Sequence, residues 1–531
     1  MRSGIVGVLA GVGFGLISTL ALAQEPVRGG EIAQNVWPEP EVLNTGITSN
    51  AGAILVTPKI IEGLLAYDRE MKPKPELATE WSIAPDGRSI TFKLRPDVKW
   101  HDGKDFTSAD VAFSLMEVAK KMHPRGRATF AGLERVDTPD PLTAVLVLSQ
   151  PAPYVMRALA AMETPILPKH VFEGSDMKTN AANMKPIGTG PFRFVEWQRG
   201  QFIVAERNPD YWAKGRPYLD RIVFKFLPDA SARGIALESG GIDAIISNNL
   251  PASEIGRLSQ LDMIAMIPDG NTYNNLLTQI DFNLKNKYLS NIKVRQAIAS
   301  AINLDFVAKA IWYGLGKPAT GPIHNELAPY YTKEGVPAYP YNPGAAEKLL
   351  DEAGFPRPSP GAMRFALTLD FMPLGEQTQR FSEYLKQMLA RIGIDVTIRN
   401  QDFATYTRRV YTDGDFDMQV AIATNSPDPT MGVQRFFSSK AIQKGVPFTN
   451  ASGYSNPEVD RLLDQAQIEV DVAKRAELFA EFQRIVMKDL PTLPIIAGQL
   501  ATLHNKRVHG LDKSAVGMND NYADVWVSAK K

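Results

Sequence analysis

The sequence predicts an α/β protein, because strand and helix patterns alternate through its second half. Apolar and polar residues alternate from Arg364 to Asp370, as expected for a strand with one buried face. Helical spacing of apolar residues follows over 381–392, and alternation returns over 394–398. A short helix near residues 403–411 and a strand over 417–423 complete a β-α-β-α-β run. Such a succession predicts a parallel sheet covered by helices.

The first half of the chain contains a hairpin followed by a helix. Residues 90–94 alternate between apolar and polar types after the turn Pro85-Asp86-Gly87, which predicts a strand with one buried face. Thr107 then stands where a helix cap is expected. The apolar face predicted for that helix contains Val111, Leu115 and Val118. The chain is therefore mixed throughout, with hairpins early and β-α units later.

Composition excludes several classes of function. The 531 residues carry 58 basic and 58 acidic side chains, so bulk charge selects neither nucleic acid nor a membrane surface. There is no cysteine, which excludes disulfides, a thiolate nucleophile and a lipid-bearing cysteine anchor. Nothing in the composition calls for a cofactor or a metal site.

The N-terminal segment predicts export. Arg2 precedes an uncharged stretch from Ser3 to Ala23 that ends in Ala-Leu-Ala, the small-x-small form of a secretory cleavage site. The alternative, a permanent membrane anchor, is disfavoured because the strongly apolar part is shorter than the roughly 20 residues that a spanning helix needs. We expect residues 1–23 to be a signal peptide, and the mature protein to be free in the periplasm.

The loop after the last predicted strand of the β-α-β-α-β run is a candidate binding loop. It reads TNSPDP, with Asn425, Ser426 and Asp428 as its polar members. Open α/β sheets place ligands at the carboxyl ends of their parallel strands. Asn, Ser, Asp and Pro are also ordinary turn residues, so a plain strand-to-loop turn is the alternative from composition alone.

Four long blocks resemble one known family. They are Pro75 to Leu115 (PELATEW...ADVAFSL), Pro186 to Trp212 (PIGTGPFRF...NPDYW), Ile280 to Asn303 (IDFNLKN...IASAIN) and Gly453 to Ala466 (GYSNPEVDRLLDQA). In this order they are similar to the large extracytoplasmic solute-binding proteins of peptide and nickel ABC importers. The resemblance covers essentially all of the chain after the signal.

The resemblance implies a two-lobed clamp of the larger periplasmic class. Lobe I would comprise residues 24–270, with an extra subdomain inserted at about 57–196, and lobe II residues 271–492. The chain would return to lobe I over 493–531. A ligand held by both lobes favours the closed clamp by its differential affinity for that state. The implied partners are a small-molecule or peptide ligand, an ABC permease and its ATPase subunits, with the binding protein acting as a monomer.

The resemblance also bears on the ligand. Peptide binders of this family hold the free amino group of the peptide on an aspartate at the position of Asn425, whereas Asp428 matches their trailing Asp-Pro. Neutral Asn425 can form hydrogen bonds but cannot compensate a charge. The loop Phe371 to Gln377, where the dipeptide binder carries an arginine for the peptide carboxylate, contains Glu376 and no basic residue. Both departures favour a ligand without a simple free amino terminus, such as a modified peptide or an opine.

Three further residues are candidate ligand contacts. Tyr273 lies near the first predicted crossing between lobes, where core packing is an equal alternative. Arg435 follows the Asp-Pro turn and could meet a ligand carboxylate, although a salt bridge is the alternative. Trp37 follows the first predicted strand and could cover a ligand, or simply pack.

Other functions find less support in the sequence. The six histidines form no H-E-x-x-H, and no serine completes G-x-S-x-G, so a secreted hydrolase is disfavoured and no enzyme is predicted. Within the family, uptake of nickel as a chelate remains an alternative to a peptide-like ligand. A binding protein that reports its ligand to a chemosensory receptor would use the same closure.

Overall fold

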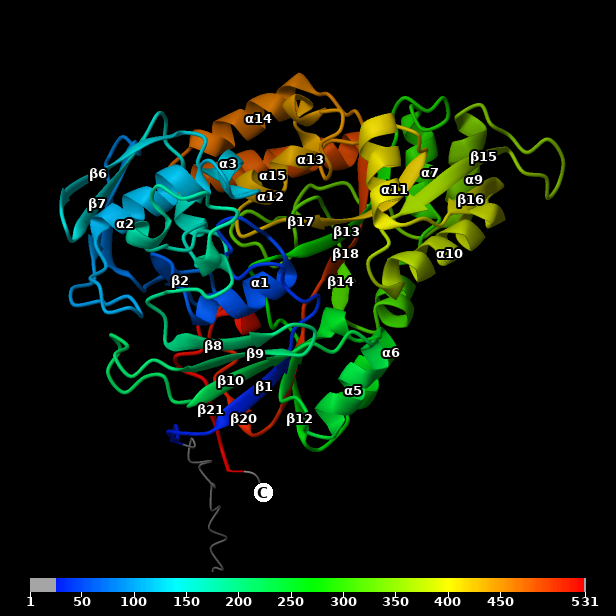
Figure 1. Cartoon of the computed structure of the whole chain (residues 1–531). Coiled ribbons are helices and arrows are strands. Elements are labelled where there is room, and N and C mark those ends of the chain that lie inside the picture. The colour runs from blue at the N-terminus through cyan, green and yellow to red at the C-terminus, as the bar shows by residue number, and fades with distance from the viewer. Residues whose placement is uncertain (1–24, 530–531) are drawn as a thin grey trace, which may run out of the picture.

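The computed structural model describes residues 25–529, which form three large β-sheets with helices packed around them (Figure 1). The predicted export signal, residues 1–23, lies outside the described residues. Within 25–529, no helix combines the length and apolar character needed to cross a bilayer. The α/β class predicted from the alternating patterns is confirmed.

The first sheet has seven strands and combines segments from both ends of the chain. In spatial order they are β12 (Ile264–Ile267), β19 (Thr502–Asn505), β11 (Ala244–Ile246), β1 (Glu31–Asn35), β10 (Arg221–Lys225), β9 (Phe202–Arg207) and β8 (Phe192–Gln198). Strand β1 runs parallel to β10 and β11. Three helices lie between strands of this sheet in sequence: α1 (Ala51–Val56), α5 (Ala230–Glu238) and α6 (Ala252–Leu258). Its core contains Ile32 and Phe224, both fully buried.

The second sheet has four antiparallel strands and lies within the range predicted for the inserted subdomain. Its order is β4 (Ala78–Ile83), β5 (Ser89–Leu94), β7 (Thr143–Leu148) and β6 (Leu133–Asp140). The predicted hairpin strand is β5. Helix α2 (Ser108–Phe113) starts with a capping box between Thr107 and Asp110, as predicted for Thr107, and continues as a π-helical turn over 114–119.

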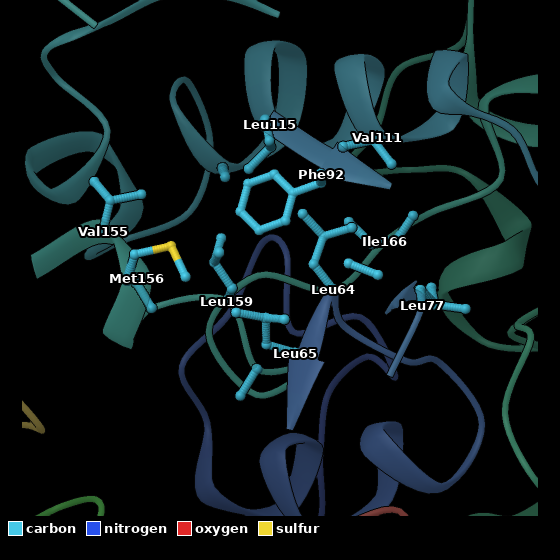
Figure 2. Close-up of a cluster of buried hydrophobic side chains, with 14 of the residues drawn as sticks. Leu64, Leu65, Leu77, Phe92, Val111, Leu115, Val155, Met156, Leu159 and Ile166 are labelled. Carbon is cyan, nitrogen blue, oxygen red and sulfur yellow. The ribbon is translucent and has the colours of Figure 1, made fainter. Parts of the chain in front are cut away.

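The core of this subdomain forms beneath α2. In Figure 2, Phe92 of β5 and Leu115 point into the same cluster as Leu64 and Leu159, and all four side chains are buried. Shorter elements complete the unit: α3 (Gly126–Thr129), α4 (Lys169–Phe172), the 3-10 turn η3 (Pro153–Arg157) and the ribbon β2 (Leu65–Tyr67) with β3 (Pro73–Pro75). This core extends to Tyr273, which belongs to the segment that leaves the first sheet.

The third sheet has six strands, in the order β14 (Gly316–Pro318), β18 (Thr492–Gly498), β13 (Leu276–Phe282), β17 (Met418–Thr424), β15 (Phe365–Phe371) and β16 (Ile394–Arg399). Strand β15 pairs in parallel with β16 and β17, which confirms the parallel pairing predicted for the β-α-β-α-β run. Strand β13 pairs antiparallel with β17 and β18, so the sheet as a whole is mixed. The parallel part was predictable because its strands are consecutive in the chain.

Helices surround the third sheet. They are α7 (Ile292–Ser300), α8 (Leu304–Phe306), α9 (Pro343–Glu352), α10 (Glu376–Arg391), α11 (Phe403–Thr407), α12 (Pro429–Gly432), α13 (Gln434–Phe437), α14 (Pro457–Ile468) and α15 (Val472–Asp489). Helix α10 buries Phe381, Leu385 and Leu389, the apolar face that its spacing predicts. In Figure 1, α14 and α15 lie at the top of the molecule, between the subdomain and the rest of this lobe.

The chain crosses between the seven-stranded and six-stranded sheets twice. The first crossing runs from β12 to β13, through residues 268–275, which includes the predicted boundary at 270. The second lies between Gly498 of β18 and Thr502 of β19. The predicted boundary at 492 thus falls at the start of β18, and sheet membership changes only after that strand ends. Below, lobe I denotes the seven-stranded sheet with the subdomain, and lobe II the six-stranded sheet with its helices.

Candidate ligand-binding site

The loop between β17 and α12 begins at Asn425, a residue that is almost fully buried. Its backbone N–H donates to the carbonyl of Asn275 at 3.0 Å. Its side-chain Oδ1 accepts a hydrogen bond from the backbone N–H of His324 at 2.6 Å. Since a backbone N–H can only donate, this contact sets the orientation of the amide. The side-chain oxygen of Asn425 is therefore engaged by the backbone of His324, and the amide nitrogen Nδ2 remains as a donor.

His324 connects this loop to the second crossing. Its Nε2 lies 3.1 Å from the carbonyl of Gly498, and its Nδ1 is 3.2 Å from the backbone N–H of Glu326. One ring nitrogen therefore donates and the other accepts, which defines a neutral imidazole. Burial lowers the pKa of His324, consistent with that neutral form. The Asn425 loop is thus tied to the end of β18, where the chain leaves lobe II.

Asp428 has a structural role in the same loop. Its two carboxylate oxygens accept hydrogen bonds from Arg475 of α15 at 2.6 and 2.7 Å, and both side chains are almost completely buried. Asp428 also caps α12 by accepting from the backbone N–H of Thr430 at 2.9 Å. With both oxygens engaged inside lobe II, this geometry assigns Asp428 to holding the loop in place.

Ser426 and Tyr273 lie where the loop meets the first crossing. Ser426 has a positive φ of 58° and its N–H donates to the carbonyl of Asn274 at 3.2 Å. The hydroxyl of Tyr273 donates to the carbonyl of Arg157 at 2.9 Å, and its ring packs 6.3 Å from that of Tyr67. Tyr273 is only 1 % exposed, so the packing interpretation of this residue is the one that its contacts support.

Arg435 of α13 forms no ion pair with a carboxylate among residues 25–529. Its Nε is buried without a hydrogen-bond partner there, and its guanidinium lies 4.9 Å from the centre of the Phe436 ring. Burial, followed by the nearby charge of Arg125, lowers the pKa of Arg435 to about 10, while Tyr411 and Glu163 act in the opposite direction. The guanidinium stays protonated at neutral pH. The salt-bridge alternative considered for Arg435 is therefore not what the structure shows.

The two charges that act on Arg435 from the subdomain form a pair of their own. Arg125 donates to Glu163 from Nε at 3.0 Å and from Nη2 at 2.6 Å, in the two-point geometry typical of arginine and carboxylate. This pair is electrically neutral, so Arg435 supplies an uncompensated positive charge where the lobes meet. The sequence did not indicate Arg125 or Glu163, since neither stands in a recognisable motif and they are 38 residues apart.

The two lobes contact each other at several points. Met431 of α12 packs against the core of the subdomain, and η3 of the subdomain packs against α14. At a separate point, Glu376 accepts a hydrogen bond from the backbone N–H of Ala252 in lobe I at 3.2 Å. We call this contact zone the interlobe seam. Its contacts define a closed arrangement of the clamp.

Trp37 lies in lobe I, just beyond the carboxyl end of β1. Its side chain is 39 % exposed, and the guanidinium of Arg233 lies 5.6 Å from the centre of its ring. The ring is therefore free to contact a ligand, in contrast to Tyr273. The structure places Asn425, Ser426 and Asp428 in one loop, and Arg435 on α13, which follows that loop and α12 in the chain. Trp37 belongs to lobe I.

A metal centre finds no support in the described part of the chain, where no group of three or more His, Asp or Glu side chains is placed to hold an ion. The site consists instead of a fixed amide, an unpaired arginine and a seam between two sheet-based lobes joined by two crossings. These features define a two-lobed solute-binding protein.

Comparisons with known proteins agree. The family model for bacterial extracellular solute-binding proteins, family 5 (middle part), matches residues 72–444. The chain belongs to this family. It is similar to the glutathione-binding protein GsiB of Escherichia coli K12, with 26% identity over 513 residues and 96% of each chain covered.

Solved structures show the same fold. The oligopeptide-binding protein AppA of Bacillus subtilis, in complex with a nonapeptide, has a TM-score of 0.78 and 25% identity, over 95% of this chain and 100% of that one. AgaA from A. tumefaciens R10, in complex with agropinic acid, has a TM-score of 0.75 and 25% identity, over 94% and 99% of the two chains. The predicted family and two-lobed fold are thereby confirmed.

Proposed function

We propose that this protein captures a small peptide-like solute bearing a carboxylate, by closure of its two lobes, and delivers it to the permease of an ABC importer. The proposed role is binding without catalysis, and the protein would act as a monomer. Residues 1–23 would direct its export to the periplasm. The ligand would lie at the interlobe seam, close to Arg435 and the Asn425 loop. The importer's ATPase subunits would supply the energy of transport.

The unpaired guanidinium of Arg435 is the observation that carries this proposal. Removing a cation from water costs several kcal/mol unless a partner of opposite charge replaces the lost solvation. The neighbouring carboxylate of Glu163 is already engaged with Arg125, and no carboxylate among residues 25–529 forms an ion pair with Arg435. A ligand carboxylate would accept two hydrogen bonds from the guanidinium and complete the charge balance.

Asn425 supports a restriction on the rest of the ligand. Its oxygen is engaged by His324, which leaves an amide donor to face a ligand. A donor binds a carbonyl, a hydroxyl or a carboxylate, and repels the N–H groups of an ammonium. We therefore propose that the ligand has no simple free amino terminus at this position. The names of two similar proteins, one a glutathione-binding protein and one solved with agropinic acid, fit a modified peptide or conjugate.

The test is a calorimetric binding panel on the mature protein. Its members are glutathione, agropinic acid, trialanine and nickel with L-histidine. We expect glutathione or agropinic acid to bind more tightly than trialanine. Arg435→Gln should weaken that binding about 100-fold, equivalent to about 2.7 kcal/mol, because the ligand carboxylate loses its partner. Arg408→Gln is the matched control, because Arg408 is 70 % exposed on a neighbouring turn.

A second variant tests the anchor position. Asn425→Asp should improve binding of trialanine, because a carboxylate can then compensate its ammonium group. Full affinity of Arg435→Gln for every bound compound would overturn the proposal. So would native mass spectrometry of periplasmic protein that shows a retained solute without any carboxylate. Tight binding of nickel with L-histidine alone would favour the chelate alternative, and solute-dependent chemotaxis without uptake would favour the receptor alternative.

A further inference from the structure

A groove of about 820 Å³ lies where the subdomain meets lobe II, and Arg435 is not among the residues that line it. The subdomain contributes Asp86 and Pro151. Helices α14 and α15 and their connection contribute most of the apolar lining: Ile468, Val470, Ala473 and Leu478. The proposed solute site uses none of these residues. The groove is therefore a second feature that needs its own explanation.

The groove spans a contact between the lobes. Its two walls belong to different lobes, and they meet at the turn that contains Gly87. A Cβ at Gly87, which has a φ of 66°, would lie 2.8 Å from Cγ1 of Val470 and 3.0 Å from Cβ of Pro151. The 3-10 turn η3 of the subdomain packs against α14 in the same contact. Opening the clamp would move the wall that contains Asp86 and Pro151 away from α14 and α15.

Apolar side chains are exposed along this surface. Ile468 is 41 % exposed, Val470 48 % and Val472 58 %, three residues within five positions of the chain. Adjacent exposed apolar residues that line a groove mark interaction sites more often than isolated ones do. The surface thus offers an apolar contact to a partner, and in this arrangement of the lobes the subdomain adjoins that contact.

The rim of the groove is acidic. Asp86, Glu469, Glu477 and Glu481 line it, against the single basic residue Lys474. Glu481 also pairs with Arg484 at 3.1 Å, and even so negative charges outnumber positive ones. This local excess contrasts with the zero net charge of the whole chain. A partner with basic residues around an apolar side chain would match both the lining and the rim.

We propose that this groove receives an extracytoplasmic segment of the importer's permease, in which an apolar side chain is flanked by lysine or arginine. The inference rests on the proposed function, and it adds the surface through which closure is recognised. A second copy of this chain is the weaker candidate. A symmetric dimer through this groove would bring one acidic rim against another, and like charges repel. A permease segment carries no such constraint.

The test uses the wild-type protein and two variants with the reconstituted permease and ATPase in proteoliposomes. Ala473→Trp fills the groove from an exposed position, and Glu477→Lys reverses an exposed charge on its rim. Each should raise the concentration of binding protein that gives half-maximal ATPase stimulation at least tenfold. Higher salt should weaken stimulation by the wild type more than by Glu477→Lys, because the lost attraction is electrostatic.

The control is Glu383→Lys on the exposed face of α10, which makes the same charge change far from the groove. It should stimulate the ATPase like the wild type. Calorimetry with glutathione should give affinities within twofold of the wild type for all three variants, which separates this inference from the solute site. If the wild-type protein bound none of the solutes in the panel, that result would instead contradict the proposed function.

Three outcomes would overturn the inference. The first is unchanged ATPase stimulation by both groove variants. The second is wild-type protein that binds glutathione and yet does not stimulate the importer. The third is sedimentation that shows a dimer of the wild type, dissociated by Ala473→Trp, since the groove would then bind a second copy.

Discussion

At the scale of single residues, charge pairing distinguishes two arginines near the Asn425 loop, one with a structural role and one proposed to bind the ligand. Arg475 is buried and fully paired with Asp428, so it stabilises lobe II. The Nε of Arg435 is buried and Arg435 forms no ion pair within residues 25–529, so it can serve a ligand. Breaking a buried pair by removing one partner is strongly destabilising. A ligand carboxylate would supply the partner of opposite charge that Arg435 lacks.

A buried acid near the same region makes stability depend on pH. Asp281 on β13 accepts hydrogen bonds from Gln279 at 2.5 Å and from Gln419 at 2.7 Å, and it forms no ion pair in the described part of the chain. Burial raises the pKa of Asp281 to about 7, although both hydrogen bonds lower it. Between about pH 4 and 7 the folded protein holds a proton here that the unfolded chain has lost. Folding stability from this group therefore falls as pH rises through 7.

Asp281→Asn should remove that dependence. From pH 5 to pH 8, the wild type should lose about 2 to 3 kcal/mol of unfolding free energy relative to this variant. Urea denaturation at the two pH values measures the difference. Asp395→Asn, at an exposed position of β16, should follow the wild type at both. Parallel behaviour of Asp281→Asn and the wild type would show that Asp281 is ionised throughout this range.

At the scale of elements, the turn from β17 into α12 depends on a close backbone approach. Helix α12 ends at Gly432, which packs directly on the backbone of Asn425. A Cβ at Gly432 would lie 2.0 Å from the carbonyl oxygen of Asn425 and 2.1 Å from its carbonyl carbon. Because neither atom belongs to a flexible side chain, only a shift of the backbone could make room. The position of the Asn425 amide is thus set by a glycine seven residues later.

Gly432→Ala should displace this turn. We expect a loss of about 2 kcal/mol in unfolding free energy, as for overpacking in a close-packed site. We also expect a loss of at least tenfold in solute affinity, because the Asn425 loop moves. Gly256→Ala is the matched control, since a Cβ at that helical position of α6 meets nothing within 4 Å. It should leave affinity unchanged and stability equal or higher. Equal behaviour of the two variants would contradict this account of the turn.

At the scale of the whole molecule, binding depends on the balance between open and closed lobes. Glu376 of α10 in lobe II accepts a hydrogen bond from the backbone N–H of Ala252 in lobe I at 3.2 Å. A partly exposed hydrogen bond of this kind contributes about 1 kcal/mol. If it forms only in the closed state, its free energy adds directly to the stability of that state and hence to ligand affinity.

Glu376→Ala keeps a good helix former at the start of α10 and removes the interlobe hydrogen bond. Solute affinity measured with glutathione should fall about fivefold, and small-angle scattering should show a more open average shape. Tyr339→Phe is the control, because its hydroxyl donates to the carbonyl of Met487 within lobe II at 2.7 Å. That variant should lose a comparable amount of stability without a loss of affinity. An affinity unchanged in Glu376→Ala would mean that this contact does not contribute to closure.

Local patterns predicted the elements well, and the site only in part. The cap at Thr107, the strand β5 and the strands β15, β16 and β17 follow from spacing that is read within a few residues. The antiparallel strands β13 and β18 beside them were not predicted, because their partners are far away in the chain. Asn425 and Arg435 were selected by their place after a strand, and the structure distinguishes their roles.

The sequence by itself determined the family, the α/β class and the loop to examine, because periodicity and ordered blocks are properties of neighbouring residues. Only the tertiary structure decided which charges are paired. Asp428 is neutralised by Arg475, 47 residues later, and Arg435 faces a pair from the first third of the chain that is already complete. The free energy of a buried charge depends on everything packed around it, and that environment exists only after distant segments have come together.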